Sequence, residues 1–86
     1  MESNIKQAVI LAGGLGTRLK PFTDDNPKPM YPVNRIPFIE KLVMQIKSFG
    51  IDDIVILLGY LPNKVIDYLG NGDKYGLSIK YDITQL

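Results

Sequence analysis

Residues 7–20 read QAVILAGGLGTRLK, an apolar run that passes directly into a glycine-rich turn. From Ala8 to Ala12 every side chain is apolar, the pattern of a β-strand that other elements cover on both faces. Such strands form the parallel sheets of α/β proteins, and the loops at their carboxyl ends line the ligand-binding crevice. The stretch therefore predicts a first strand over 6–12 and a binding loop immediately after Ala12.

The rest of the chain continues a βαβαβ pattern. Apolar residues recur at helical spacing over 38–49, and Gly50 stands where the cap of that helix belongs. Residues 54–58 form a second apolar run, short and rich in β-branched side chains, which is typical of a buried strand. A second helix is predicted over 62–69, followed by a strand over 77–82 whose polar and apolar residues alternate as they do near a sheet edge.

These segments predict an α/β fold, specifically a three-layer, Rossmann-like βαβαβ half with parallel strands. In the doubly wound order the first strand lies at one side of this half, with an unpaired apolar edge. An unpaired edge readily joins another chain, so we expect this edge to be where homo-oligomers form. The five prolines between Arg18 and Pro37 predict an ordered, extended loop.

The bulk composition excludes several classes of protein. The 86 residues make one domain at most, and a net charge of +1 provides no general attraction for nucleic acid or for a membrane surface. No cysteine or histidine is present, which excludes disulfides and thiolate- or imidazole-bound metals. The first residues do not resemble a secretion signal, and no apolar run approaches roughly 18 residues, so we expect a cytoplasmic protein.

The glycine-rich turn and two cations after it predict a site for a triphosphate. Glycines at 13, 14 and 16 allow backbone N–H groups to approach phosphate oxygens closely. Arg18 offers a planar fork for bidentate phosphate contact, and Lys28 offers a mobile point charge. Two common phosphate motifs are excluded by spacing: the dinucleotide fingerprint would need glycine where Leu19 stands, and the P-loop pattern has no match.

The same residues carry a family resemblance. The stretch LAGGLGTRLKPFT followed by PKPMYPV resembles the sugar nucleotidyltransferases, which join a nucleoside triphosphate to a sugar 1-phosphate, giving an NDP-sugar and pyrophosphate. The resemblance extends through Gly59-Tyr60 and the GNGD and IKY stretches, so it covers nearly the whole chain. It implies a transferase of nucleotide-sugar biosynthesis, with a nucleoside triphosphate and a sugar 1-phosphate as its partners.

The resemblance also implies roles for individual residues. Arg18 and Lys28 correspond to the cations that contact the leaving pyrophosphate and align the reacting phosphates, and we take them as the catalytic pair. Their task is electrostatic stabilisation of an in-line displacement, which needs no protein nucleophile. The predicted nucleotide-binding residues are Leu11, Ala12, Gly13, Gly14, Gly16, Thr17 and Arg18.

Other parts of the family pattern fall outside the chain. The resemblance places the metal-binding aspartates of the family after Leu86, so we expect Mg²⁺ as the cofactor with ligands outside this chain and assign no metal ligand here. We therefore interpret residues 1–86 as the N-terminal, triphosphate-binding part of a larger nucleotidyltransferase domain, inactive on its own. The base and the sugar are not specified by these residues.

Two other functions remain open. One is a non-catalytic nucleotide-binding module that keeps the loop. The other is a nucleotidyltransferase that acts on a phospho-alcohol such as phosphocholine. The role of Tyr60 is also open, because a tyrosine after the second strand either reaches a ligand or packs within the fold.

Overall fold

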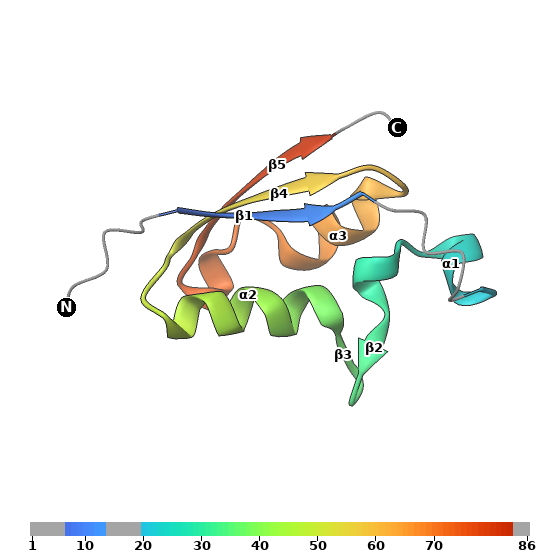
Figure 1. Cartoon of the computed structure of the whole chain (residues 1–86), viewed down its shortest axis with the longest axis horizontal. Helices are drawn as coiled ribbons and strands as arrows, with labels where there is room; N and C mark the ends of the chain where they lie inside the picture. Colours follow the sequence, from blue (N-terminus) through green and yellow to red (C-terminus); the bar gives the residue numbers. More distant parts are fainter. Residues whose placement is uncertain (1–6, 14–19, 84–86) are drawn as a thin grey trace.

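The computed structural model of the chain describes residues 7–13 and 20–83. A parallel sheet forms its centre, and the helices that connect the strands lie on one side (Figure 1). The elements are, in order, β1 (Gln7–Ala12), α1 (Phe22–Asp25), the 3₁₀ turn η2 (Lys28–Met30), β2 (Pro32–Val33), β3 (Ile36–Pro37), α2 (Phe38–Ser48), β4 (Asp53–Leu58), α3 (Pro62–Leu69), the 3₁₀ turn η3 (Asp73–Tyr75) and β5 (Ser78–Ile83).

The sheet has the strand order β1-β4-β5, and both pairings are parallel. Ala12 lies opposite Leu58, and Leu58 lies opposite Ile83, so the three strands end at the same level. The predicted βαβαβ half with parallel strands is confirmed. In Figure 1 the arrowheads of all three strands point toward the side on which α1 lies.

The core lies between the sheet and the helices α2 and α3. Because the strand order steps in one direction, two right-handed crossovers place both helices on the same face. Side chains that alternate along the strands meet side chains spaced three or four residues apart on the helices. The buried apolar residues are Ile10, Ile39, Val43, Ile54, Ile56, Leu58, Val65, Leu69, Leu77 and Ile79.

The expectation that both faces of β1 are covered is wrong for the described part of the chain. Ile10 is buried, but its neighbours Val9 and Leu11 are 58% and 81% exposed. They belong to the face of the sheet opposite to α2 and α3, which the described residues leave open (Figure 1). A connecting helix would lie on that open face only if the strand order changed direction. The order β1-β4-β5 runs in one direction throughout. The described residues therefore supply two of the three expected layers.

The proline-rich segment is more structured than an extended loop. It contains the short helix α1, the turn η2 and a hairpin in which β2 pairs with β3. The hairpin turns at Asn34 and Arg35, which have φ values of 53° and 71°. Two successive residues with positive φ suit a two-residue hairpin turn. Asparagine tolerates that conformation, whereas arginine rarely adopts it, so the sequence did not indicate the hairpin.

The unpaired edge of β1 agrees with its predicted position. Within residues 7–13 and 20–83, β1 has a single hydrogen-bonded neighbour, β4. Whether this edge joins two copies stays a prediction.

No helix in the described part of the chain is both long enough and apolar enough to span a membrane.

A group of tyrosines links α2 to α3 and to the segment after α3. The hydroxyls of Tyr68 and Tyr75 both donate hydrogen bonds to Oε1 of Glu40, at 3.1 and 2.7 Å. Burial and then the Glu40 carboxylate raise the pKa values of both tyrosines. Tyr81 donates to the carbonyl of Gly70 at 2.6 Å, and burial raises its pKa to about 12.

These shifts predict a loss of stability in alkali. Tyrosine in the unfolded chain ionises near pH 10, so above about pH 10 the unfolded state releases protons that the folded state keeps. The stability that is complete below pH 10 should therefore fall as the pH rises toward 12. Urea unfolding between pH 8 and 12 measures it, and Tyr81→Phe should reduce the decline. An unchanged decline in that variant would contradict the shift for Tyr81.

The turn before β5 requires glycine for steric reasons. Gly72 has a φ of +89°, and an added Cβ would lie 2.8 Å from both the Leu77 carbonyl oxygen and Cγ1 of Ile79. Gly50, after α2, has a similar φ of +86°, but nothing lies within 4 Å of its added Cβ. The two positions therefore share the backbone conformation and differ in the space around it.

We expect Gly50→Ala to cost about 1–2 kcal/mol of unfolding free energy, the usual penalty for a left-handed L-residue. Gly72→Ala should cost roughly 1–3 kcal/mol more, because the methyl group would clash with the Leu77 carbonyl, and relieving that clash requires the backbone to shift. Urea unfolding of the two variants measures the difference. Equal losses would mean that the turn around Gly72 relaxes freely.

Candidate nucleotide-binding site

A pocket of about 200 Å³ lies where the end of β1 faces η2 and the start of α2. It brings together three residues that were predicted from the sequence: Leu11, Ala12 and Lys28. Gly13 follows them at the end of the strand. The remaining lining residues are Ile10, Pro29, Phe38, Ile39 and Leu42. At this volume the pocket suits part of a nucleotide, since sites that enclose drug-sized ligands measure about 300–1,000 Å³.

Lys28 is held by buried residues on both sides. Pro27 and Pro29 are buried, whereas the Lys28 side chain is exposed. Short backbone hydrogen bonds close the turn, from the Met30 N–H to the Pro27 carbonyl at 3.0 Å and from the Tyr31 N–H to the Lys28 carbonyl at 2.9 Å. The two prolines anchor the backbone in the fold, and the cation between them is presented at the pocket.

The segment that carries Lys28 is also fixed at its ends. The rings of Phe22 and Tyr31 pack edge to face, with their centroids 5.2 Å apart, and so bring α1 next to the end of η2. The Phe38 N–H donates to the Tyr31 carbonyl at 2.9 Å, which joins the segment to the start of α2. The Lys28 backbone is therefore held by the buried prolines, by the contact of the two rings and by the hydrogen bond to α2, as a site for a specific ligand requires.

Four of the predicted binding residues, Gly14, Gly16, Thr17 and Arg18, lie outside the described residues. Their predicted roles, and the assignment of Arg18 to the catalytic pair, stay predictions. In the described ranges, 7–13 and 20–83, no three side chains of histidine, cysteine, aspartate or glutamate gather as metal ligands would. The expectation that the ligands of Mg²⁺ lie outside this chain stays a prediction.

The chemistry of the pocket combines an apolar wall with a cation at its rim. Leu11, Ala12 and Leu42 present hydrocarbon surface, to which a flat ring or a sugar face can pack. Lys28 adds a positive charge able to bind a phosphate oxygen. The arrangement therefore suits a ligand with one apolar part and one anionic part.

Sequence reasoning missed one wall of the pocket and left the role of Tyr60 open. The wall formed by Phe38 and Leu42 was predicted only as part of a helix over 38–49, because helical periodicity does not distinguish a helix face that covers a core from one that also borders a pocket. Tyr60 does not line this pocket; its hydroxyl donates to the carbonyl of Asp24 at 3.0 Å. The hydroxyl of Tyr60 therefore has a partner within the fold, and contact of this residue with a ligand stays a prediction.

Comparison with known proteins gives the family. A family model described as nucleotidyl transferase matches residues 7–85. The chain belongs to the nucleotidyl transferase family. It is 45% identical over 76 residues to the choline-phosphate cytidylyltransferase of Streptococcus pneumoniae, covering 88% of this chain and 32% of that protein. It is 42% identical over 79 residues to the D-glycero-alpha-D-manno-heptose 1-phosphate guanylyltransferase of Campylobacter jejuni, covering 92% of this chain and 35% of the relative.

A solved structure of a related protein has the same fold as this chain. The crystal structure of a putative glucose-1-phosphate thymidylyltransferase from Bacillus anthracis, in complex with sucrose, superposes with a TM-score of 0.87 at 37% sequence identity. The match covers 93% of this chain and 33% of that one. Both the family and the Rossmann-like fold that the sequence predicted are therefore confirmed. The nucleotidyl transferase chain spans about a third of the length of these relatives.

The position of Lys28 predicts a role in anion binding. Lys28→Met keeps the apolar part of the side chain and removes the charge, so it should weaken binding of inorganic triphosphate about tenfold. Lys80→Met, on the edge strand β5, removes the same charge from an exposed position outside the pocket and should leave the affinity unchanged. Isothermal titration calorimetry of both variants measures the effect. Equal weakening in both would mean that only the net charge matters.

Proposed function

We propose that this chain supplies the triphosphate-binding part of an enzyme that transfers a nucleotidyl group to a sugar 1-phosphate. The observation that carries the proposal is the pocket at the end of β1, which unites Leu11, Ala12 and Lys28. The names of the relatives support it, since they include guanylyl- and uridylyltransferases for sugar phosphates. In the proposed reaction an oxygen of the sugar phosphate attacks the α-phosphorus. The bond from that phosphorus to the bridging oxygen breaks, and pyrophosphate leaves with the electron pair.

In the proposed reaction some residues bind the nucleotide and others stabilise the charge of the reacting phosphates. Leu11 and Ala12 pack against the base and sugar of the nucleotide, and the backbone from Gly13 through Gly14, Gly16 and Thr17 binds the triphosphate. Arg18 contacts the departing pyrophosphate, while Lys28 aligns the reacting phosphates. Fixed cations around an in-line displacement lower its barrier without forming a covalent intermediate.

The proposal places the rest of the machinery outside these residues. Since the chain spans about a third of its relatives, we propose that residues 1–86 are the N-terminal part of the catalytic domain and are inactive alone. Mg²⁺ is the expected cofactor, with ligands from outside the chain, and the expected location is the cytoplasm.

A second candidate is transfer of a cytidylyl group to phosphocholine. It is favoured by the choline-phosphate cytidylyltransferase, which is 45% identical to this chain. The pocket does not distinguish the two reactions, because in both proposals its residues bind the nucleotide and not the acceptor. A non-catalytic nucleotide-binding module is the third reading, and it differs by forming no product.

Pyrophosphate release tests the proposal. The assay combines several nucleoside triphosphates with sugar 1-phosphates or phosphocholine in the presence of Mg²⁺. It uses the chain itself and two versions extended after Leu86, one by the remainder of the Campylobacter jejuni relative and one by the remainder of the Streptococcus pneumoniae relative. We expect no turnover by the chain alone and an NDP-sugar from the first extended version. A product from the second extended version alone would favour the second candidate, and nucleotide binding without any product would favour the third.

Arg18→Ala in the first extended version tests the catalytic role. It should cost about 2–4 kcal/mol of transition-state stabilisation, as removing one preorganised donor does. Arg35→Ala is the matched control, because it removes the same group from the exposed hairpin turn. The ratio of kcat/KM values measures the cost. Unchanged turnover in Arg18→Ala would remove Arg18 from the mechanism.

A further inference from the structure

The connection from β4 to α3 touches the backbone at the end of β1. An added Cβ at Gly59 would lie 2.7 Å from the carbonyl oxygen of Gly13 and 3.2 Å from its Cα. Gly59 does not have a left-handed φ, so its own backbone conformation would accept alanine. Glycine is therefore required here by the position of Gly13, which passes too close for any side chain.

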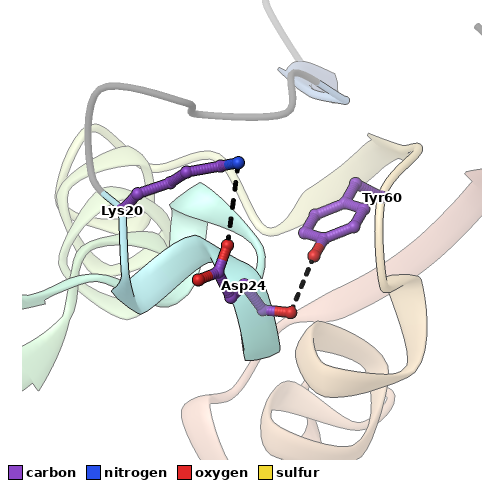
Figure 2. Close-up of polar contacts among 3 residues, drawn as sticks. All are labelled: Lys20, Asp24 and Tyr60. Carbon is purple, nitrogen blue, oxygen red and sulfur yellow. Dashed lines mark hydrogen bonds and ion pairs between the residues drawn. The ribbon is translucent and has the colours of Figure 1, made fainter.

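The next residue makes a second contact, to the helix α1 that precedes the turn carrying Lys28. The Tyr60 hydroxyl donates to the Asp24 carbonyl of α1 at 3.0 Å, as Figure 2 shows. The Asp24 carboxylate points the other way and pairs with Lys20 at 3.8 Å. Because Tyr60 and Asp24 are 36 residues apart in sequence, this bond is a tertiary link and not a feature of one local turn.

The third residue has a costly backbone conformation. Leu61 precedes the first residue of α3 with φ 47° and ψ 55°, the left-handed region that non-glycine residues rarely adopt. Such strain persists when the surrounding structure determines it, and it is concentrated near functional sites. Here the conformation turns the chain sharply from β4 into α3, immediately after the two residues that contact Gly13 and α1.

We propose that the Gly59–Leu61 corner is a positioning element for the nucleotide site. It sets the distance between Gly13, which directly follows the pocket residue Ala12, and α1, which leads into the turn carrying Lys28. The two contacts come from adjacent residues that directly follow β4: at Gly59 the close approach of Gly13 leaves no room for a side chain, and at Tyr60 the hydroxyl donates a hydrogen bond. The ligand in this proposal rests on the proposed function, whereas the geometry of the corner does not.

Tyr60→Phe tests the hydrogen bond, with Tyr81→Phe as the matched control. Tyr81 also donates its hydroxyl to a backbone carbonyl, that of Gly70, but outside the pocket. Both variants should lower the melting temperature by similar amounts. Only Tyr60→Phe should raise the Kd for a nucleoside triphosphate, by about threefold to tenfold, the range expected for one hydrogen bond. Equal Kd values in the two variants would overturn the positioning role of Tyr60.

Gly59→Ala tests the close approach, with Gly50→Ala as its control. Alanine at 59 meets the Gly13 carbonyl, whereas alanine at 50 meets nothing within 4 Å. Amide NMR spectra of the ligand-free protein should show shifts at Gly13 and Ala12 in Gly59→Ala and none there in Gly50→Ala. Unmoved Gly13 and Ala12 signals in Gly59→Ala would overturn the inference.

The same spectra separate this inference from the proposed function. In ligand-free Tyr60→Phe, the amides of Asn26 and Tyr31, which close α1 and η2, should exchange with solvent about threefold to tenfold faster. Tyr81→Phe should leave both rates unchanged. If the unaltered protein binds no nucleotide, the proposed function fails, but these exchange rates still decide whether the corner holds the segment. Unchanged exchange rates in Tyr60→Phe would contradict the positioning role of the corner.

Discussion

The parallel pairing of β1 with β4 is the constraint on which the rest of the structure depends. The two strands end level with each other, Ala12 opposite Leu58, so the loops that follow them begin side by side. A parallel pair cannot be joined by a tight turn and needs a long crossover. In this chain the crossover contains η2 as well as α2, so the connection that completes the sheet also returns Lys28 to the end of β1.

The pairing also explains why the sheet is covered on one face. Along β4 the residues alternate between buried and half-buried, and the buried set faces α2 and α3. The other face carries apolar side chains, among them Val9 and Leu11, that the described residues leave exposed. Monomeric proteins rarely expose large apolar patches, and the relatives, about three times longer, have additional chain beyond the matched region.

Much of this arrangement was predictable from local sequence. The strands, the helices α2 and α3 and the strand order follow from hydrophobic periodicity and from the rules for crossovers. The glycine-rich turn, the cations after it and the family resemblance assigned Ala12 and Lys28 to one site. The hairpin at Asn34 and Arg35 was not predictable, because an arginine with positive φ is stabilised by its surroundings and not by its own preference. The contact of Tyr60 with Asp24 was also not predictable, since a single tyrosine carries no periodic signal and its partner is a backbone carbonyl.

The buried prolines on either side of Lys28 have a consequence for conformational entropy. A loop that orders only when its ligand arrives loses backbone freedom at that moment, at a cost of about 1–2 kcal/mol for each residue. Pro27 and Pro29 have restricted φ values even in the unfolded chain, and in the folded state both are packed inside. An anion that binds at this turn therefore has to order only the flexible side chain of Lys28, while the backbone beneath it is already in place.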